Sequence, residues 1–373
     1  MALLEVNDLT VSYPARAGAV PAVRGVDLTL DQGETLGLAG ESGCGKSTMA
    51  AAVLRLLPPG TRTTGTVLLE GEDVLTMRPG RLRAVRWTEA AVVFQGAMHA
   101  LNPVRRVGDQ IAEAIQLHDK VGDKQAATRV GELLEQVGLP ARRAPSYPHE
   151  LSGGQRQRVM IAMALACSPR LLIADEPTTA LDVMVQAQVL TLLEELRREL
   201  GLALLLITHD LSVLASTCER IAVMYAGRIV EEGPAAEVFE SPSHPYTHAL
   251  AEAFPTIGDR ASRRNPHGLG GDPPDPSDLP SGCEFHPRCP VSIAACPTLD
   301  AELWPAGEGR RAACVHVRDG HPELVRQVPP MPVGAQQAAF DAEGLADAFD
   351  LDGGAGRAHA GSRQRNSWVG PAA

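Results

Sequence analysis

The chain has 373 residues, a hydrophobic content of 44% and a formal net charge of −11 at pH 7. It is longer than one average domain, so we expect one large domain with an appendage. The acidic balance argues against non-specific binding to nucleic acid or anionic lipid, because both demand a basic surface. No apolar stretch approaches the ~20 residues of a spanning helix, and the N-terminus has no features of a secretory signal. We therefore expect a cytosolic protein whose seven cysteines are thiols or metal ligands.

Over roughly the first 235 residues, short apolar runs alternate with helical patterns, which predicts an α/β domain. Residues 34–39 predict a strand that ends in glycine, and residues 46–57 predict a helix stopped by a Pro-Pro-Gly sequence. Two continuous apolar runs, residues 171–174 and 203–207, are typical of parallel strands covered on both faces. A hairpin is predicted over residues 221–230.

The composition changes twice along the chain. Residues 96–160 are polar and predict a helical insertion, with helices over residues 107–117 and 124–137. Residues 236–330, called the C-terminal extension below, include a Pro- and Gly-rich stretch and four cysteines. Residues 331–373 are rich in Ala and Gly with little periodicity, and we expect them to be disordered.

A glycine-rich loop lies between the first predicted strand and its helix. It fits the pattern G-x-x-x-x-G-K-[ST] of a phosphate-binding loop. Its residues are Gly40, Glu41, Ser42, Gly43, Cys44, Gly45, Lys46, Ser47 and Thr48. The glycines let backbone N–H groups point at phosphate oxygens, and the helix N-terminus adds partial positive charge. We expect Lys46 to reach the β- and γ-phosphates and the Ser47 hydroxyl to bind Mg²⁺.

Two acidic residues follow the apolar run at residues 171–174. The carboxyl end of a strand is where an α/β sheet places ligand-binding groups. We expect Asp175 to hold Mg²⁺ and Glu176 to take the proton from an attacking water. Together with the loop, this pair predicts a P-loop NTPase.

A second glycine sequence makes the family more specific. Leu151 is followed by Ser152, Gly153, Gly154 and Gln155. This sequence resembles the signature of ATP-binding cassette (ABC) ATPases, and the resemblance extends from about residue 3 to residue 250. The other residues that mark the family are present in the expected order along the chain. They are Tyr13 (adenine-stacking aromatic), Gln95 (Q-loop), Asp182 (D-loop) and His209 (switch histidine).

The resemblance implies a RecA-like α/β core with an antiparallel β subdomain and a helical subdomain. It implies that two ATPase subunits pair head to tail, so that residues 152–155 of one bind the γ-phosphate of ATP held by the other. Gln95 would touch Mg²⁺, and His209 would contact the γ-phosphate. The chain would therefore be an ATPase that drives transport through separate membrane subunits. Alternatives are an ABC exporter ATPase and a non-transport ABC ATPase acting on nucleic acid or ribosomes.

Three features resemble the ATPase subunits of dipeptide, oligopeptide and nickel permeases. They are the extended Q-loop (in which Gly96-Ala97 departs from the usual Asp-Pro), the sequence from Ser243 to Thr247, and the cysteine set. We accordingly expect an importer, most simply of di- or oligopeptides. The implied partners are two permease subunits, a second ATPase subunit and an extracytoplasmic solute-binding protein, with no nucleic acid. The implied location is the cytoplasmic face of the cell membrane, as a peripheral subunit.

The cysteine set comprises Cys283, Cys289, Cys296 and Cys314. The spacing lacks the Cys-x2-Cys pairs typical of zinc, whereas thiolate-only ligation suits an iron–sulfur cluster. Resemblance to peptide-permease ATPases favours a [4Fe-4S] cluster, with Zn²⁺ or unligated thiols as alternatives. Few apolar residues surround the set, so we expect a metal centre, and not an ordinary core, to order this segment. Because it lies outside the nucleotide motifs, we expect it to take no part in hydrolysis.

Overall fold

A computed structural model describes residues 2–15, 18–96, 100–253, 270–300 and 302–326. The chain divides at residue 332, and its first unit, Met1–Pro332, is compact. Only the first contains described residues, so the predicted disorder of residues 331–373 concerns a segment outside them. Within the described ranges, no helix has the length and apolar character needed to cross a membrane.

The N-terminal sheet is antiparallel, with strand order β2-β1-β4-β5. Its strands are β1 (Ala2–Ala15), β2 (Gly18–Asp31), β4 (Arg62–Leu69) and β5 (Glu72–Asp73). In β2, Val26, Leu28 and Leu30 are buried and alternate with exposed residues, as expected for a strand with one face on the core. This sheet is the antiparallel β subdomain that the family resemblance implied.

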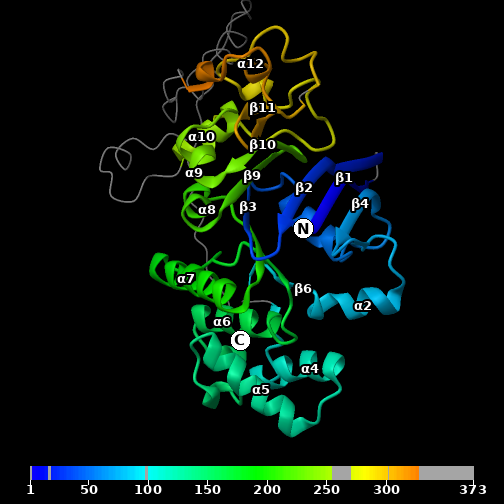
Figure 1. Cartoon of the computed structure of the whole chain (residues 1–373), viewed down its shortest axis with the longest axis vertical. Helices are drawn as coiled ribbons and strands as arrows, with labels where there is room; N and C mark the ends of the chain where they lie inside the picture. The colour runs from blue at the N-terminus through cyan, green and yellow to red at the C-terminus, as the bar shows by residue number, and fades with distance from the viewer. Residues whose placement is uncertain (1, 16–17, 97–99, 254–269, 301, 327–373) are drawn as a thin grey trace, which may run out of the picture. The chain divides into compact units, whose positions relative to one another are not determined.

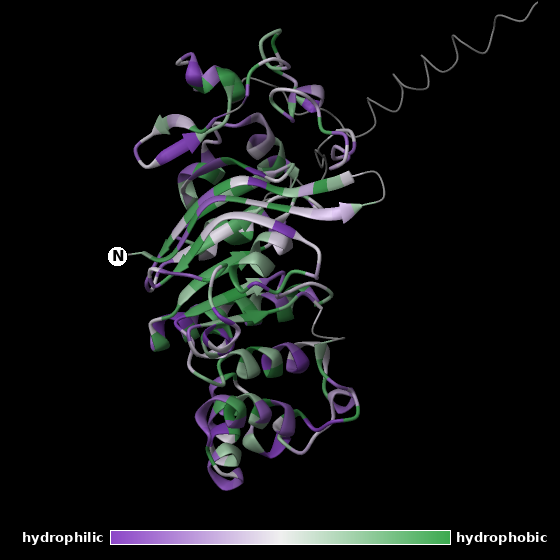
Figure 2. Cartoon of the chain, turned by 90° about the vertical axis from the view of Figure 1, so that its right-hand side faces the viewer, coloured by the Kyte–Doolittle hydropathy of each residue, from purple (hydrophilic) through white to green (hydrophobic). Residues whose placement is uncertain are grey.

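The second sheet has the strand order β11-β12-β10-β9-β3-β8-β7-β6. Its strands are β3 (Thr35–Ala39), β6 (Ala90–Val93), β7 (Leu171–Asp175), β8 (Ala203–Ile207), β9 (Arg220–Tyr225), β10 (Arg228–Pro234), β11 (Trp304–Gly307) and β12 (Arg310–Ala312). Strands β9, β3, β8, β7 and β6 are parallel, and every residue of β3, β7 and β8 is buried. The predicted apolar strands and the β9–β10 hairpin are confirmed. The apolar residues concentrate in these strands (Figure 2).

Helix α1 (Lys46–Val53) follows β3 and ends earlier than residue 57, where the sequence pattern placed its end. Arg55 adopts a left-handed backbone conformation with φ of 51°, which stops the helix. The Arg86 guanidinium then donates hydrogen bonds to the carbonyls of Leu54 (3.0 Å) and Arg55 (2.7 Å). Arg86 belongs to α2 (Pro79–Thr88), a helix that the sequence analysis did not predict.

The helical subdomain contains α4 (Val107–Asp119), α5 (Asp123–Gln136) and α6 (Gly153–Ala164), which lie together at one end of the first unit (Figure 1). Short 3₁₀ turns at Ala141–Arg143 and Pro148–Glu150 precede α6. The two predicted helices are confirmed. Helix α6 continues past residue 160, the predicted end of the insertion, because its apolar face packs against α7 (Val183–Leu200).

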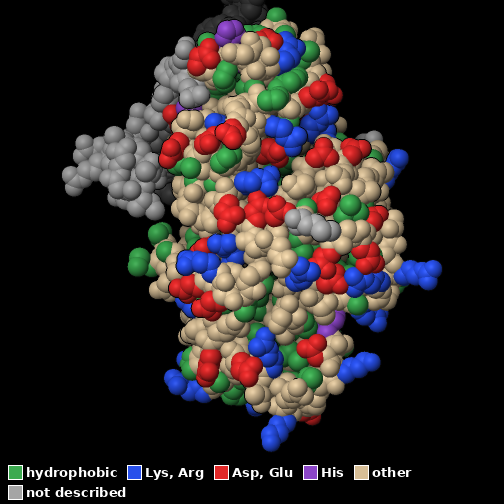
Figure 3. Space-filling model, in the orientation of Figure 1, with side chains coloured by type: hydrophobic (Ala, Val, Ile, Leu, Met, Phe, Trp, Pro, Cys, Tyr) green, Lys and Arg blue, Asp and Glu red, His purple; other side chains and the backbone are tan. Residues whose placement is uncertain are grey.

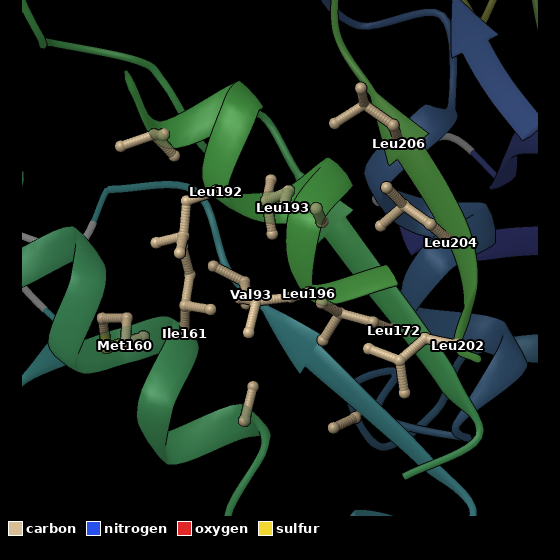
Figure 4. Close-up of a cluster of buried hydrophobic side chains, with 14 of the residues drawn as sticks. Val93, Met160, Ile161, Leu172, Leu192, Leu193, Leu196, Leu202, Leu204 and Leu206 are labelled. Atoms are coloured by element: carbon tan, nitrogen blue, oxygen red, sulfur yellow. The ribbon is translucent and has the colours of Figure 1, made fainter. Parts of the chain in front are cut away.

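Figure 4 shows this junction between the helices and the main sheet. The contributing side chains are Met160 and Ile161 from α6, Leu192, Leu193 and Leu196 from α7, and Val93, Leu172, Leu202, Leu204 and Leu206 from the strands and the residue that precedes β8. The signature sequence, which opens α6, is therefore fixed to the core that carries the acidic pair.

The C-terminal extension continues the fold of the core. After α8 (Leu211–Thr217) and the hairpin come α9 (Ala235–Glu240), α10 (Pro245–Ala253), a 3₁₀ turn at His286–Arg288, strands β11 and β12, α12 (Val315–Arg318) and a 3₁₀ turn at Pro322–Arg326. Strand β12 pairs with β10, and β11 pairs with β12, so the extension adds two strands to the main sheet.

Packing orders the segment that carries the cysteines. The Phe285 ring is 2% exposed and lies 5.3 Å from the Tyr225 ring and 5.5 Å from the Tyr246 ring. Buried Arg310 pairs with fully buried Glu231 at 3.0 Å. The expectation that an ordinary core could not order this segment is therefore wrong: three aromatic rings, a shared sheet edge and a buried ion pair hold it against the ATPase core.

Candidate functional site

The loop between β3 and α1 contains three glycines whose backbone conformation favours glycine. Gly40, Gly43 and Gly45 have φ of 152°, 82° and 109°, in the region that favours glycine. A Cβ on Gly45 would lie 2.2 Å from the Ala22 carbonyl oxygen. A Cβ on Gly40 would likewise lie 2.3 Å from the Met224 carbonyl oxygen, so the loop backbone is packed too closely for side chains at these two positions.

Lys46 lies in the centre of the loop and is 5% exposed. Its Nζ donates to the carbonyl oxygens of Gly40 at 2.7 Å and Glu41 at 2.8 Å, and lies 3.8 Å from the buried Cys44 sulfur. On the rim, the Tyr13 hydroxyl is hydrogen-bonded to the Thr48 hydroxyl at 3.1 Å. The predicted loop residues and the predicted aromatic residue therefore come together.

Asp175 ends β7 beside the loop. It is 5% exposed, and its Oδ1 atom has no hydrogen-bond partner among the described residues. Burial raises the pKa of Asp175 and the charge of Glu176 adds to this, while a hydrogen bond from Ser47 and the charge of Lys46 lower it. A buried carboxylate oxygen without a partner, next to a serine hydroxyl, is the donor set that a hard divalent cation such as Mg²⁺ prefers.

Glu176 gathers the other predicted catalytic side chains around it. Its Oε2 accepts hydrogen bonds from Gln95 Nε2 at 2.5 Å and from the Thr179 hydroxyl at 2.9 Å. His209 Nδ1 lies 3.9 Å from the second oxygen, Oε1. The backbone of Glu176 is left-handed, with φ of 45°, and its N–H donates to the Ile207 carbonyl at 2.9 Å. Side chains from the ends of β6, β7 and β8 thus converge on one carboxylate.

These groups line one cavity of about 950 Å³. Its lining includes all the residues from Glu41 to Thr48, with Tyr13, Gln95, Glu176 and His209. Part of the wall comes from the C-terminal extension, through Pro273, Pro274, Pro276 and Leu279. The sequence analysis did not predict this wall.

The signature residues lie elsewhere. Ser152 caps α6: its Oγ accepts from Gln155 N at 3.3 Å, and Gln155 Oε1 accepts from Ser152 N at 3.1 Å. A Cβ on Gly154 would lie 2.5 Å from the Val185 side chain, so close packing on α7 requires glycine there. Asp182 caps α7, accepting from Val185 N at 3.0 Å. Neither residues 152–155 nor Asp182 line the cavity of their own chain.

The four clustered cysteines surround a second, small and mostly apolar cavity. Cys283, Cys289, Cys296 and Cys314 all line it. Burial raises the pKa of Cys283 to about 11 and that of Cys289 to about 12. Within the described ranges, no three His, Cys, Asp or Glu side chains converge as ligands of a single metal ion. This arrangement by itself therefore assigns no metal to the four cysteines, neither zinc nor an iron–sulfur cluster.

Sequence reasoning missed three contacts at the main site. The Thr179 hydroxyl holds Glu176, the Tyr246 hydroxyl accepts from the backbone N of Glu41 at 2.7 Å, and Arg288 pairs with the Glu41 carboxylate at 2.8 Å. A signal was present for Tyr246, which lies in the sequence from Ser243 to Thr247 that resembles peptide-permease ATPases. No sequence signal pointed to Arg288, apart from its position between two of the clustered cysteines.

Comparison with known proteins identifies the family of this chain. Residues 23–179 match the ABC transporter family, and residues 230–296 match the oligopeptide/dipeptide transporter C-terminal region. The chain is 45% identical to the oligopeptide transport ATP-binding protein OppD of Salmonella typhimurium over 317 residues, 84% of this chain and 93% of that protein. It is 46% identical to a probable peptide ABC transporter ATP-binding protein of Sinorhizobium fredii, over 84% of this chain and 94% of that protein.

A solved structure supports the same assignment. The dimeric ATP-binding cassette MJ0796, in a post-hydrolysis state with ADP and Pi, matches at a TM-score of 0.57 and 29% identity, over 62% of this chain and 98% of that one. The loop, the acidic pair and the residues around Glu176 occur here in the fold of such cassettes. The chain therefore belongs to the ABC transporter family, as one of its ATP-binding, ATP-hydrolysing subunits.

Proposed function

We propose that this subunit hydrolyses ATP to drive the uptake of di- or oligopeptides through separate membrane subunits. The observation that carries the chemistry is the Glu176 carboxylate, held at the cavity by Gln95 and Thr179 beside His209. The peptide cargo rests on the names of the relatives and on the match of the C-terminal extension to oligopeptide/dipeptide transporters.

In this proposal the loop binds the phosphates and Glu176 starts the chemistry. The loop amides and Lys46 hold the β- and γ-phosphates, and Tyr13 stacks on the adenine. Ser47, Asp175 and Gln95 would hold Mg²⁺, which neutralises phosphate charge when bound. Glu176 accepts a proton from water as the water oxygen bonds to the γ-phosphorus. The bond from this phosphorus to the β–γ bridging oxygen breaks, which gives ADP and phosphate.

We further propose that the site is completed by a second ATPase subunit. Ser152 and the amides of Gly153 and Gly154 start α6 but do not line their own cavity. A helix N-terminus is a ready site for an anion, so these groups would bind the γ-phosphate of the partner's ATP. Val183 and Met184, 74% and 71% exposed directly after Asp182, supply apolar surface for that contact.

The other expected partners are two permease subunits and, through the complex, an extracytoplasmic solute-binding protein. The subunit would work at the cytoplasmic face of the membrane. Phe94 (46% exposed) and Val104 (80% exposed) lie on either side of the Q-loop and offer apolar contact for a permease. On the face shown in Figure 3, acidic and basic side chains are interspersed, which does not favour nucleic acid as a partner.

Uptake by living cells tests the cargo. In the source organism, deletion of the gene should abolish uptake of a labelled tripeptide, and the wild-type gene should restore it while Glu176→Gln should not. Uptake of a free amino acid serves as the control and should be unchanged. Full tripeptide uptake in the deletion strain, with loss of uptake of another solute, would reject the peptide assignment and keep the transport one.

We also propose that the four cysteines hold a [4Fe-4S] cluster. Four thiols line one apolar cavity, so a complete set of four cysteine ligands is available there. A thiol-only donor set suits an iron–sulfur cluster, which would add stability to the extension.

Anaerobic purification tests the cluster. The protein should be brown and contain iron and acid-labile sulfide, and Cys289→Ser should lose both while Cys218→Ser, a buried cysteine outside the set, should keep them. If the protein is colourless and contains stoichiometric zinc, the cysteines bind zinc and the iron–sulfur hypothesis is rejected. Metal-free protein with four titratable thiols in the set would end the metal hypothesis.

A further inference from the structure

The phosphate loop is held in place by the C-terminal extension. Both terminal nitrogens of Arg288 bind the Glu41 carboxylate, Nη1 to Oε2 at 2.8 Å and Nη2 to Oε1 at 3.0 Å. The Glu41 N–H donates to the Tyr246 hydroxyl at 2.7 Å, and its carbonyl accepts from Lys46 Nζ at 2.8 Å. Glu41, the second residue of the loop, is thus contacted by the extension at its side chain and at its backbone.

Arg288 is fixed in a single geometry. Its Nε donates to the Gly270 carbonyl at 2.9 Å, and its Nη1 also donates to the Tyr225 hydroxyl at 3.3 Å. The guanidinium lies 5.8 Å from the centres of both the Tyr225 and the Phe285 rings, and its side chain is 8% exposed. A buried, bidentate arginine–carboxylate pair gives directional hold as well as charge neutralisation.

The residues that reach the core are neighbours of the clustered cysteines. Arg288 precedes Cys289. Glu284 follows Cys283, is 4% exposed, and pairs with Arg24 at 2.5 Å. Arg24 in turn donates to the Ala226 carbonyl at 3.2 Å, and Ala226 lines the nucleotide cavity. Two contacts therefore join the cysteine-bearing segment to the ATPase core, while the prediction that the cysteines take no part in hydrolysis stays a prediction.

The charge of Glu41 explains why Arg288 matters for a phosphate ligand. A carboxylate in a loop that binds phosphates repels them, and in a partly buried place this repulsion is only weakly screened. Arg288 cancels that charge and turns the carboxylate toward the extension. Loss of Arg288 would leave an unpaired negative charge in the loop.

We propose that Arg288 is a positioning residue for ATP binding, which acts through Glu41 and couples the order of the cysteine-bearing segment to nucleotide affinity. This rests on the proposed ATP site. By linkage, the coupling is reciprocal: nucleotide in the cavity should make the segment from residue 281 to residue 296 more ordered.

A charge-rescue series on the full-length protein tests the first half of the proposal, the effect of Arg288 on ATP binding. Arg288→Gln should weaken binding of MgATP about tenfold, and Arg288→Lys should fall between it and wild type. The double variant Glu41→Gln/Arg288→Gln should recover most of the loss, because no unpaired charge remains. Arg311→Gln is the control: it removes another extension–core pair, with Glu232 at 2.8 Å, away from the loop, and should bind normally.

In the assembled complex, Arg288→Gln should raise KM for ATP and leave kcat near wild type, because Glu176, Gln95 and His209 are untouched. Unchanged affinity in Arg288→Gln, or a double variant no better than the single one, would overturn the proposal. Wild-type protein that binds no MgATP would instead reject the ATP site itself, so the two failures are distinguishable.

Hydrogen exchange tests the second half of the proposal, the coupling between nucleotide and the cysteine-bearing segment, with a readout other than activity. MgATP should slow exchange in residues 281–296 of the wild type and of Arg311→Gln. In Arg288→Gln the same addition should leave exchange there unchanged. Equal slowing in wild type and Arg288→Gln would show that the coupling does not pass through Arg288, and would overturn it.

Discussion

At the scale of single residues, Glu176 shows how the surroundings prepare one side chain. One oxygen accepts two hydrogen bonds, from Gln95 and Thr179, while the other faces His209 at 3.9 Å. The left-handed backbone at Glu176 turns the side chain out of β7, whose residues are otherwise buried. The carboxylate is therefore fixed in direction, with one oxygen left on the side of the cavity for a water.

Replacing Glu176 by glutamine should stop turnover and keep ATP binding. The amide cannot accept the proton, and loss of one general base typically costs ~10²–10⁴ in rate. The loop and Lys46 are unchanged, so ATP should still bind and should trap a closed dimer. Steady-state ATPase activity of the purified complex and its size with MgATP check both points. Glu195→Gln, an exposed change on α7, should behave as wild type. Near-normal activity of Glu176→Gln would refute the role.

At the scale of elements, the N-terminus of α6 is built to present groups outward. Ser152 and Gln155 form a reciprocal cap, so the helix start needs no other protein partner. Gly154 lets α6 approach α7 closely. The same packing that orders the helix therefore leaves the Ser152 hydroxyl and the first amides at the surface.

Ser152→Arg should abolish hydrolysis while the isolated monomer still binds ATP. The added bulk and charge block the surface that would meet the partner's nucleotide, but the monomer's own cavity does not contain Ser152. Loss of the cap costs about 1 kcal/mol of stability, so the fold should survive. Titration of labelled ATP onto monomer decides the matter, with Ser216→Arg on α8 as a matched charge control. A large loss of monomer binding would place Ser152 in its own site.

Features that depend on residues close together in the sequence could be predicted, whereas features that depend on distant residues could not. Continuous apolar runs identified β7 and β8, and motif spacing identified Glu176 and the residues around it, because these signals are local. The end of α1 depended on Arg86, which is 31 residues beyond Arg55. The pair between Arg288 and Glu41 joins positions 247 residues apart. Such contacts have no local pattern, so the position of the extension against the loop could not be predicted.

At the scale of the whole molecule, one buried network joins the extension to the core. Glu231 in β10 is fully buried and accepts from the N–H groups of Ser243 and His244 and from Arg310. His244 Nδ1 accepts from Tyr246 N at 3.1 Å, and Tyr246 carries the hydroxyl that contacts the phosphate loop. The network therefore links the added sheet edge, the cysteine-bearing segment and the nucleotide cavity.

This network should make the stability of the first unit depend on pH through His244. Burial lowers the pKa of His244 to about 3, from an ordinary value near 6.5. Above pH 6.5 the side chain is neutral in both folded and unfolded chains. Between pH 6.5 and 3 the unfolded chain binds a proton that the folded chain does not, so stability falls as the pH falls. From pH 7 to 5.5 the loss should be about 1 kcal/mol.

Urea unfolding of wild type and His244→Asn at pH 7 and pH 5.5 checks this. Asparagine keeps an acceptor for Tyr246 N but does not titrate. The variant should be less stable at pH 7, because it loses the ring packed 5.9 Å from Phe285. Its further loss on acidification should be smaller than that of wild type by about 1 kcal/mol. Glu231, a buried carboxyl that accepts from the N–H groups of Ser243 and His244, is common to both proteins, so its titration cancels in the comparison. Equal losses in the two proteins would show that His244 becomes protonated within the folded chain, and that the network tolerates the charge.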